Sequence, residues 1–308
     1  MYPCDINLTM ELSLIISTYN RAESLMRTLE SVAQQSADPS NWECVVVNNA
    51  STDDTAERCA QFIADHPSYN IRLVDEPRQG LSYARNSGVA LSQGRNIAFI
   101  DDDETISENF VEAYINLFTT HTAFAAAGVV EAQYECGRPR WMSKYPEKMI
   151  ANPFDLGNKV ITIPSSITPP GGNMAFKREI FTLYGDFDTA LGRKGTELLG
   201  SEENDMFARI RALGERVYYV PEAKVYHHIS ADKLTPEYFE ALSYGVGRSK
   251  RIRAEKEGSL KFLYEDERKK RHITNLLALF YILTLRPCKA KWLLRMRKGI
   301  SRGVFERA

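Results

Sequence analysis

The chain has 308 residues, of which 44% are apolar and 26% charged, so we expect a globular protein with one α/β domain and an appendage, or two domains. Its longest apolar run, Leu276 to Leu283, has eight residues, whereas a membrane-spanning helix needs about 20, which argues against an integral membrane protein. The formal charge of −1 is unevenly spread, because residues 248–308 contain 18 Lys and Arg against 6 Asp and Glu.

Strands and helices are predicted to alternate over the first third of the chain. Short apolar runs predict four buried strands, at 12–16, 44–47, 71–74 and 96–100. Helical spacing between these runs predicts helices after the capping residue Asn20, over 53–64 and over 81–91. Strands separated by helices indicate an α/β domain with a mostly parallel, Rossmann-like sheet flanked by helices.

The pattern is less regular after residue 104. We predict, in chain order, a helix over 109–118, a strand over 124–130, a loop over 136–172, helices over 177–184 and 202–213, and β-stretches over 216–220 and 223–226. A loop as long as 136–172 in a compact domain is usually functional. Residues 231–308 predict basic helices, so we expect the α/β domain to span residues 1–230 and a helical extension to follow it.

Polar residues follow three of the predicted strands directly. These stretches are Thr18-Tyr19-Asn20, Asn48-Asn49 and Asp101-Asp102-Asp103. In parallel sheets, ligands bind beyond the carboxyl ends of the strands, so we expect the three stretches to converge on one edge. The three adjacent carboxylates would repel one another unless a cation neutralised them. A divalent ion, Mn²⁺ or Mg²⁺, would do so and keep coordination positions for phosphate oxygens. The alternative is a solvated acidic turn.

Further candidates for a site lie in the second half of the chain. Glu202 and Glu203 begin a predicted helix, whose dipole would keep a carboxylate ionised and able to accept a proton, although acidic first turns are common in ordinary helices. Of His227 and His228, at most one can face a site near the aspartates, because neighbouring strand residues point to opposite faces. A neutral imidazole suits Mn²⁺ better than Mg²⁺. A surface or core histidine is the alternative.

Two more motifs allow both a binding role and an ordinary one. The stretch Gly171-Gly172-Asn173 would let the backbone approach a ligand closely, or would form a plain turn. Arg85, within Gly80-Leu81-Ser82-Tyr83-Ala84-Arg85-Asn86, would clamp a phosphate or lie along a nucleoside, or would be an ordinary surface arginine.

The order of these motifs over residues 12–229 resembles glycosyltransferase family 2, an inverting family with the GT-A fold. The matching stretches are 14–21, 45–53, 80–86, 101–103, 171–173, 202–203 and 219–227. Each stretch is weakly specific alone, and their common order carries the resemblance. The resemblance implies a nucleotide-binding part over 12–103 and an acceptor-binding, catalytic part over 104–230.

The resemblance also implies roles for individual residues. Asp103 would bind the metal directly, with His227 approaching it from the other side. Asp102 would lie near the ribose and Asp101 would support the turn. The residues expected to line the nucleotide, commonly a uridine diphosphate, are Thr18, Tyr19, Asn20, Asn49 and Arg85. Glu203 would be the general base, while Gly172, Asn173 and Glu202 would face the donor sugar or the acceptor.

Two positions depart from the family pattern. Glu203 stands where the family commonly has Asp, and its longer side chain still supplies a carboxylate. Asn48-Asn49 stands where the nucleoside-binding turn usually holds Asp, and an amide can pair with a base edge as donor or acceptor. Uracil is therefore the expected base, with less support than an aspartate would provide.

A narrower similarity over residues 153–247 is to bacterial members that assemble surface polysaccharides. It implies transfer of a sugar from a UDP-sugar to a saccharide acceptor, often one linked to a polyprenyl carrier at the inner membrane face. The alternatives are a non-catalytic scaffold that binds a nucleotide-sugar and a nucleotidyltransferase. The latter would need a glycine-rich loop after the first strand, and the stretch from Thr18 to Arg21 contains no glycine.

The last segment and the cysteines bear on location. Basic residues on both sides of the apolar stretch 276–285 predict helices that lie in an anionic membrane interface, the alternative being helices packed on the body of the protein. The segment has no recognised nucleic-acid-binding motif, so we expect no nucleic-acid partner. The five cysteines form no Cys-x-x-Cys pair and the start of the chain does not resemble a signal peptide. We expect a cytoplasmic protein, peripheral on the inner face of the membrane.

Overall fold

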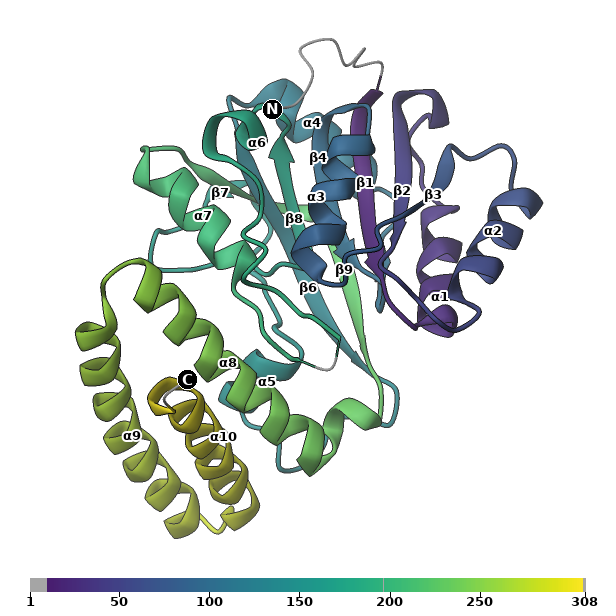
Figure 1. Ribbon diagram of the computed structural model, residues 1–308. Helices are drawn as coiled ribbons and strands as arrows, with labels where there is room; N and C mark the ends of the chain where they lie inside the picture. Colours follow the sequence, from purple (N-terminus) through teal and green to yellow (C-terminus); the bar gives the residue numbers. More distant parts are fainter. Residues whose placement is uncertain (1–9, 196, 307–308) are drawn as a thin grey trace. The chain divides into compact units, whose positions relative to one another are not determined.

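The computed structural model describes residues 10–195 and 197–306, which form two compact units (Figure 1). Unit 1 contains the described part of Met1–Glu131 together with Phe154–Thr189 and Glu202–His228. Unit 2 contains Ala132–Pro153, the described part of Ala190–Ser201, and Ile229 onward. The units therefore differ from the expected division at residue 230, because two earlier segments pack with the C-terminal helices.

The described strands form one sheet in the order β3-β2-β1-β4-β8-β6-β9-β5, with β7 paired to β9. They are β1 (Met10–Thr18), β2 (Trp42–Asn48), β3 (Ile71–Asp75), β4 (Gly94–Asp101), β5 (Glu104–Ile106), β6 (Ala125–Tyr134), β7 (Ile161–Thr162), β8 (Asn173–Lys177) and β9 (Val217–Ile229). The strands from β3 to β4 pair in parallel, whereas β8 pairs antiparallel with both β4 and β6. The parallel, Rossmann-like arrangement is therefore confined to the first half of the sheet.

The helices of unit 1 are α1 (Ala22–Val32), α2 (Thr55–Asp65), α3 (Leu81–Leu91), α4 (Phe110–Thr120), α6 (Glu179–Tyr184) and α7 (Glu202–Ala212), with the 3-10 helix η1 (Pro39–Asn41). Those of unit 2 are α5 (Lys144–Ile150), α8 (Pro236–Lys256), α9 (Leu260–Leu283) and α10 (Pro287–Phe305), with η2 (Asp232–Leu234). None of the helices in the described residues is both long and apolar enough to cross a bilayer.

The elements differ from the sequence-based predictions in four places. The first helix begins at Ala22 with Arg21 as its N-cap, not Asn20, because Asn20 adopts a φ of 51° and its side chain bonds to another turn. The predicted loop 136–172 contains α5 and β7. Lys177 belongs to β8, since it pairs with β4, so α6 begins two residues later. The two predicted β-stretches are a single strand, β9, which continues through Pro221.

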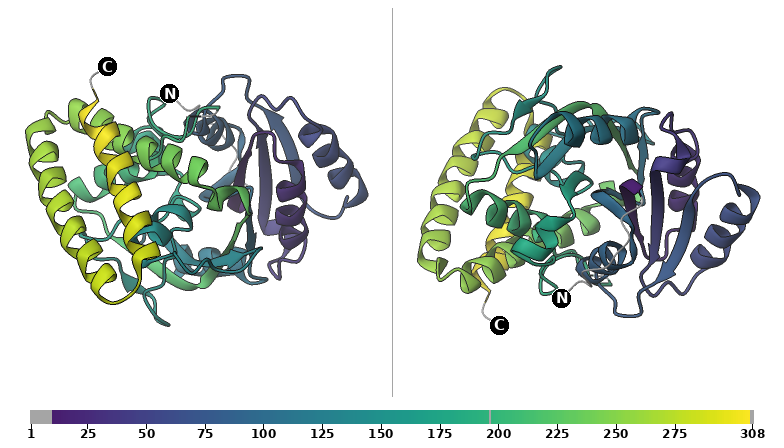
Figure 2. Two further views of the ribbon diagram at one scale, coloured as in Figure 1. Left: turned by 90° about the horizontal axis from the view of Figure 1, so that it is seen from below. Right: turned by 90° about the horizontal axis from the view of Figure 1, so that it is seen from above.

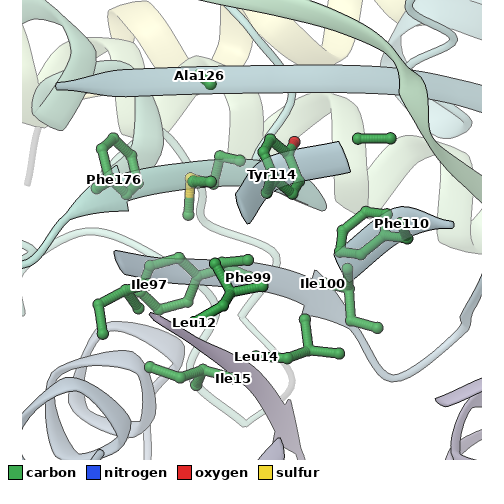
Figure 3. Packing of buried hydrophobic residues seen from close by; sticks show 14 of the residues in the cluster. Leu12, Leu14, Ile15, Ile97, Phe99, Ile100, Phe110, Tyr114, Ala126 and Phe176 are labelled. Carbon is green, nitrogen blue, oxygen red and sulfur yellow. The ribbon is translucent and has the colours of Figure 1, made fainter. Parts of the chain in front are cut away.

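The core of unit 1 lies where α3, α4 and α6 pack against the sheet. Phe99 on β4 contacts Phe176 and Phe187 edge to face, with ring centroids 6.1 and 5.4 Å apart. Figure 3 shows Phe99 beside Ile97 and the strand β1, with Phe176 on the neighbouring β8. Burying each such side chain contributes about 1.5–3 kcal/mol, so this core fixes the strand ends that carry the polar residues.

Unit 2 has a separate core between α5, α8 and α10. Phe239 of α8 is fully buried and packs edge to face on Trp292 of α10, with ring centroids 4.9 Å apart. Trp292 also stacks on Trp141, at 3.9 Å. Gly247 and Gly303 let α8 and α10 approach closely, because a methyl group at either position would collide with the backbone of the facing helix. The two helices pack on each other within unit 2, whose last helix, α10, is drawn in yellow in Figure 2.

Candidate functional site

The polar stretches after β1, β2 and β4 lie next to one another at the edge of the sheet. In the strand register, Thr18 is opposite Asn48 and Ser17 is opposite Asp101. The carboxyl ends of three adjacent parallel strands therefore meet, as predicted from their order in the sequence. Residues from all three turns therefore lie at one edge of the sheet.

Two of the three aspartates are buried and held by Arg21. Nη1 of Arg21 lies 3.1 Å from Oδ1 of Asp102 and 2.5 Å from Oδ2 of Asp103. Asp102 also accepts a 2.8 Å hydrogen bond from the hydroxyl of Thr18. Burial raises the pKa of Asp102 to about 6, although the positive charge of Arg21 acts in the opposite direction. The positive charge of Arg21, which follows β1, thus partly neutralises the aspartates that follow β4.

His227 faces Asp103 from the opposite side, across the pairing of β5 with β9. Its Nε2 lies 3.6 Å from Oδ1 of Asp103, whereas Nε2 of His228 lies 2.9 Å from the hydroxyl of Thr105. One of the two histidines therefore approaches the aspartates. Two atoms that bind one ion at about 2.0–2.2 Å lie about 3 Å apart, so Asp103 and His227 fit a shared metal after a small movement.

The donor set of this pair is a carboxylate oxygen and an imidazole nitrogen, which suits Mn²⁺. Among residues 10–195 and 197–306, no three His, Cys, Asp or Glu side chains converge closely enough to hold a metal on their own. Asp103 and His227 therefore provide two donor atoms that lie close together at this edge, and a metal there would need further ligands from elsewhere.

Asp101 is tied to a second arginine. Arg85 on α3 is buried, and its Nη2 donates at 3.2 Å both to Oδ1 of Asp101 and to the carbonyl oxygen of Gly171. Its Nη1 donates at 2.6 Å to Oε1 of Glu202, the first residue of α7. The expected role of Arg85 as a clamp on phosphate or nucleoside is therefore not supported, because its guanidinium is enclosed and bonded to protein groups. It joins the aspartate turn to the start of α7.

The glycine pair before β8 makes room for two glutamates. A methyl group on Gly171 would lie 3.3 Å from Cγ of Glu203, and a side chain on Gly172 would collide with the carboxylate of Glu104. Glu104 is buried and accepts a 2.8 Å hydrogen bond from the backbone N–H of Asp101. The sequence predicts a close approach of the backbone to a ligand at these glycines. In the structure, the groups that the backbone approaches are the side chains of Glu203 and Glu104.

Glu203 is half-buried at the start of α7. Burial, followed by the negative charge of the adjacent Glu202, raises the pKa of Glu203 to about 8, while Arg85 lowers it. The amide of Asn204 donates to Oε1 of Glu203 at 2.5 Å. A carboxyl group that titrates near neutrality is suited to general acid–base work.

The asparagines expected at the nucleotide hold loops together. Asn49 donates to the carbonyl oxygens of Glu76 and Arg78 and accepts from the N–H of Gly80. Both amide hydrogens of Asn49 are therefore used, which contradicts a role as a donor to a base edge. Oδ1 of Asn20 accepts from the N–H of Thr52 at 2.7 Å and so joins the first two turns. Tyr19, which precedes Asn20 in the turn after β1, is part-exposed.

The predicted contact between Asn173 and a ligand is contradicted by its surroundings. The side chain of Asn173 is fully buried, accepts from the hydroxyl of Tyr114 at 2.5 Å, and donates to the carbonyl oxygens of Val129 and Ala223 at 2.8 Å each. Its amide therefore links β8 to β6 and β9 and presents no group to a substrate.

Three charged residues of the site were missed as candidates from the sequence. Arg21 contacts Asp102 and Asp103, Glu104 supports the N–H of Asp101, and Asp75 at the end of β3 accepts from the amide of Asn48 at 2.8 Å. Arg21 and Asp75 each stand at or just beyond a strand's carboxyl end, a position that signals a ligand edge. Glu104 had no comparable signal, because its role depends on the facing Gly172.

The sequence matches the model of the family described as "Glycosyl transferase family 2" over residues 13–184. It is 29% identical over 251 residues to the glucosyl-dolichyl phosphate glucuronosyltransferase of Haloferax volcanii, covering 79% of this chain and 77% of that protein. It is 26% identical over 257 residues to the succinoglycan biosynthesis protein ExoM of Rhizobium meliloti, covering 83% and 79%.

Solved structures agree with the fold. The mannosyltransferase PcManGT from Pyrobaculum calidifontis, in complex with GDP-Man and Mn²⁺, superposes with a TM-score of 0.64 at 17% identity, over 99% of this chain and 90% of that one. S. aureus TarS 1-349 in complex with UDP superposes with a TM-score of 0.55 at 16% identity, over 95% and 91%. The chain thus has the GT-A fold. Because the family model spans more than half of its residues, this protein belongs to glycosyl transferase family 2.

Proposed function

We propose that the chain is a metal-dependent, inverting glycosyltransferase that moves a sugar from a UDP-sugar to a saccharide acceptor. The observation that carries the proposal is the link through Arg85, which bonds to Asp101 at one end and to Glu202, the neighbour of Glu203, at the other. One guanidinium thereby joins the neighbour of Asp102, in the turn proposed to bind the metal–diphosphate, to the neighbour of Glu203, the group proposed to transfer a proton.

The donor would bind at the edge formed by the turns after β1, β2 and β4. Tyr19 would stack on the base, Asp102 would lie near the ribose, and Thr18 would orient Asp102 through their 2.8 Å hydrogen bond. Asp103 and His227 would hold Mn²⁺ or Mg²⁺, with oxygens of the diphosphate as further ligands. The bound ion would neutralise charge on the departing nucleoside diphosphate.

Glu203 would act on the acceptor. In its ionised form it would remove the proton from the attacking hydroxyl group. The acceptor oxygen would then form a bond to the anomeric carbon from the face opposite the diphosphate, and the bond from that carbon to the diphosphate oxygen would break. One displacement inverts the configuration at the anomeric carbon. Gly171 would leave room for Glu203 beside the sugar, because a larger residue at position 171 would contact the side chain of Glu203.

The acceptor would be a saccharide of a cell-surface glycan, carried on a polyprenyl-type lipid. Support comes from the names of the two relatives, one acting on a glucosyl-dolichyl phosphate and the other taking part in succinoglycan biosynthesis. We place the reaction on the cytoplasmic side of the membrane, as expected from the sequence. UDP is the proposed nucleotide, as in the complex of TarS with UDP.

A panel of nucleotide-sugars tests the proposal. Binding of the right donor stabilises the folded state, so melting temperatures measured with Mn²⁺ should rise for one base and sugar. Transfer to a lipid-linked saccharide is then measured with that donor, for the wild type and for Glu203→Gln. A wild-type rate in Glu203→Gln would exclude Glu203 as the base. Binding of nucleotide with metal but no transfer to any acceptor would instead indicate a non-catalytic scaffold.

A further inference from the structure

The outer face of α9 is apolar and exposed. Ile273, Leu276, Leu279, Phe280 and Leu283 all lie in the second half of this helix and are all exposed, Leu276 by 69% and Leu283 by 75%. Their spacing of one, three or four residues places them on one side of the helix. The opposite side carries the buried residues Glu267, Thr274 and Ala278. These five residues, together with Leu285 in the turn that follows, are named the α9 ridge.

The α9 ridge continues into the turn before α10. Leu285 is 90% exposed and adopts a φ of 57°, which is unusual for a residue with a branched side chain. Leu294 on α10 is also exposed. Exposed single leucines are ordinary, but several on one helix face form a continuous patch of the kind that marks an interaction site. Figure 1 shows α9 and α10 as an antiparallel pair joined by this turn.

Positive charge surrounds the ridge and negative charge is excluded from it. The stretch from Arg268 to Arg302 contains eleven Lys and Arg residues and no Asp or Glu. Several of the basic side chains are exposed, namely Arg268, Lys269, Arg271, Arg286, Lys291 and Lys298. Of the carboxylates that precede this stretch on α9, that of Glu267 is buried and bonded to Arg297 and Ser301, that of Asp266 pairs with Lys270, and that of Glu265 is exposed. From Arg268 to Arg302, the exposed charged side chains are therefore all positive.

We propose that the α9 ridge docks this protein onto an anionic phospholipid bilayer, with α9 lying in the plane of the interface. An apolar helix face bordered by Lys and Arg has the chemistry that binds such a surface, because acyl chains accept the leucines and phosphate groups accept the cations. The helix lies on the bilayer and does not cross it. A second copy of the chain fits less well, since pairing two ridges would bring their like charges together. A nucleic acid would pair with the basic residues but would leave the leucines exposed to water.

Vesicle flotation tests the docking directly, with neither donor nor metal present, so its result is independent of the proposed chemistry. The wild-type chain is mixed with vesicles of phosphatidylcholine alone or of phosphatidylcholine with phosphatidylglycerol. We expect binding to the anionic vesicles, with little binding to the neutral ones. The variant Leu276→Asp/Leu283→Asp should bind about a hundredfold more weakly, because two leucines no longer enter the acyl region.

A matched control uses the exposed leucines of unit 1. Leu183 and Leu213 are exposed by 59% and 63%, so Leu183→Asp/Leu213→Asp removes similar apolar surface elsewhere and should bind as the wild type does. The charge-neutralising variant Lys269→Gln/Arg271→Gln should lose about tenfold or more of its affinity for anionic vesicles. Circular dichroism and thermal melting establish that each variant is folded.

A second measurement keeps the test decisive if the aspartate variant does not fold. Leu276→Trp retains an apolar side chain, and its fluorescence should shift to shorter wavelength when anionic vesicles are added. Equal binding of the ridge variant and the wild type, or a wild type that does not bind anionic vesicles, would overturn the proposal. So would a dimer, seen by ultracentrifugation without vesicles, that the ridge variant converts to a monomer, because the ridge would then contact a second copy.

Discussion

Arg85 and Glu202 form a buried ion pair, in which Nη1 of the arginine lies 2.6 Å from Oε1 of the glutamate and both side chains are at most 5% exposed. The other terminal nitrogen of Arg85 reaches Asp101. The pair therefore joins the end of β4 to the start of α7, which are about a hundred residues apart in the sequence. Because Oε2 of Glu202 has no hydrogen-bond partner within the described residues, Arg85 carries much of the compensation for burying this charge.

The first prediction concerns removal of Arg85. Arg85→Met leaves the carboxylate of Glu202 buried without its cation, and we expect a loss of about 3–5 kcal/mol in the free energy of unfolding. Urea denaturation measures this loss. The double variant Arg85→Met/Glu202→Leu should recover most of the stability but none of the activity, because the turn and α7 are no longer joined. Additive losses in the double variant would show that the pair is not coupled.

The second prediction concerns the metal. Asp103→Asn removes the charged oxygen that faces His227, and we expect Mn²⁺ to bind in the presence of UDP at least about tenfold more weakly. Electron paramagnetic resonance of free Mn²⁺ measures the binding. Asp54→Asn, at an exposed position before α2, is the control and should leave the affinity unchanged. Unaltered Mn²⁺ binding in both Asp103→Asn and His227→Ala would exclude this pair as ligands.

The third prediction is a dependence on pH. Glu203 is a base only when ionised, and its pKa is raised to about 8, so kcat/KM of the wild type should rise with pH and level off above about 8. Glu203→Gln should lower kcat by about 10²–10⁴-fold at every pH. Glu57→Gln, at an exposed position in the first turn of α2, is the matched control and should keep the wild-type profile. A wild-type kcat/KM that does not change with pH would show that ionisation of Glu203 does not control the rate.

The raised pKa of Glu203 also makes the stability of the folded protein depend on pH. The pKa of Glu203 is higher in the folded protein than its ordinary value of 4.5, so the folded state is favoured by protonation. That contribution is fully present below about 4.5 and is lost as the pH rises through about 8. Glu203→Gln cannot ionise, so its melting temperature relative to the wild type should increase between about pH 6 and pH 9. A difference in melting temperature between the variant and the wild type that stays constant over this pH range would contradict the raised pKa of Glu203.

The fourth prediction concerns the glycine pair. Gly172→Ala would force the carboxylate of Glu104 away from the N–H of Asp101, and we expect about 1–3 kcal/mol of destabilisation together with loss of activity. Gly171→Ala meets Glu203 at 3.3 Å and should act mainly on the rate. Gly200→Ala, where an added methyl group meets open space, is the control. Equal stability of Gly172→Ala and Gly200→Ala would show that Glu104 is readily displaced.

Much of the first half of the fold followed from the sequence. Apolar runs bounded by helical spacing predicted β1 to β4 and the helices between them, because a buried parallel strand and an amphipathic helix each have a local pattern. The sequence predicted the antiparallel half of the sheet less accurately. The continuous strand β9 was predicted as two pieces, since Pro221 is a local signal of interruption that pairing with neighbouring strands overrides.

In the candidate site, too, the sequence predicted the surroundings of some residues and not of others. The convergence of Thr18, Asn48 and Asp101 followed from their position after parallel strands. Asn49 and Asn173 could not be assigned in this way, because a free amide and an amide engaged by the backbone of a distant loop look alike in a sequence. Their hydrogen-bond partners lie 27 to 59 residues away along the chain.

By itself, the sequence determined the family, the parallel strands and the edge at which their polar ends meet, because these depend on local patterns and on the order of motifs. Only the tertiary structure decided which of these polar side chains are engaged by other groups of the protein. Arg85 changed from a proposed substrate clamp to an internal link, and Arg21 emerged as the neighbour of Asp102 and Asp103. The physical reason is that a charged side chain takes its role from the partners that folding brings to it.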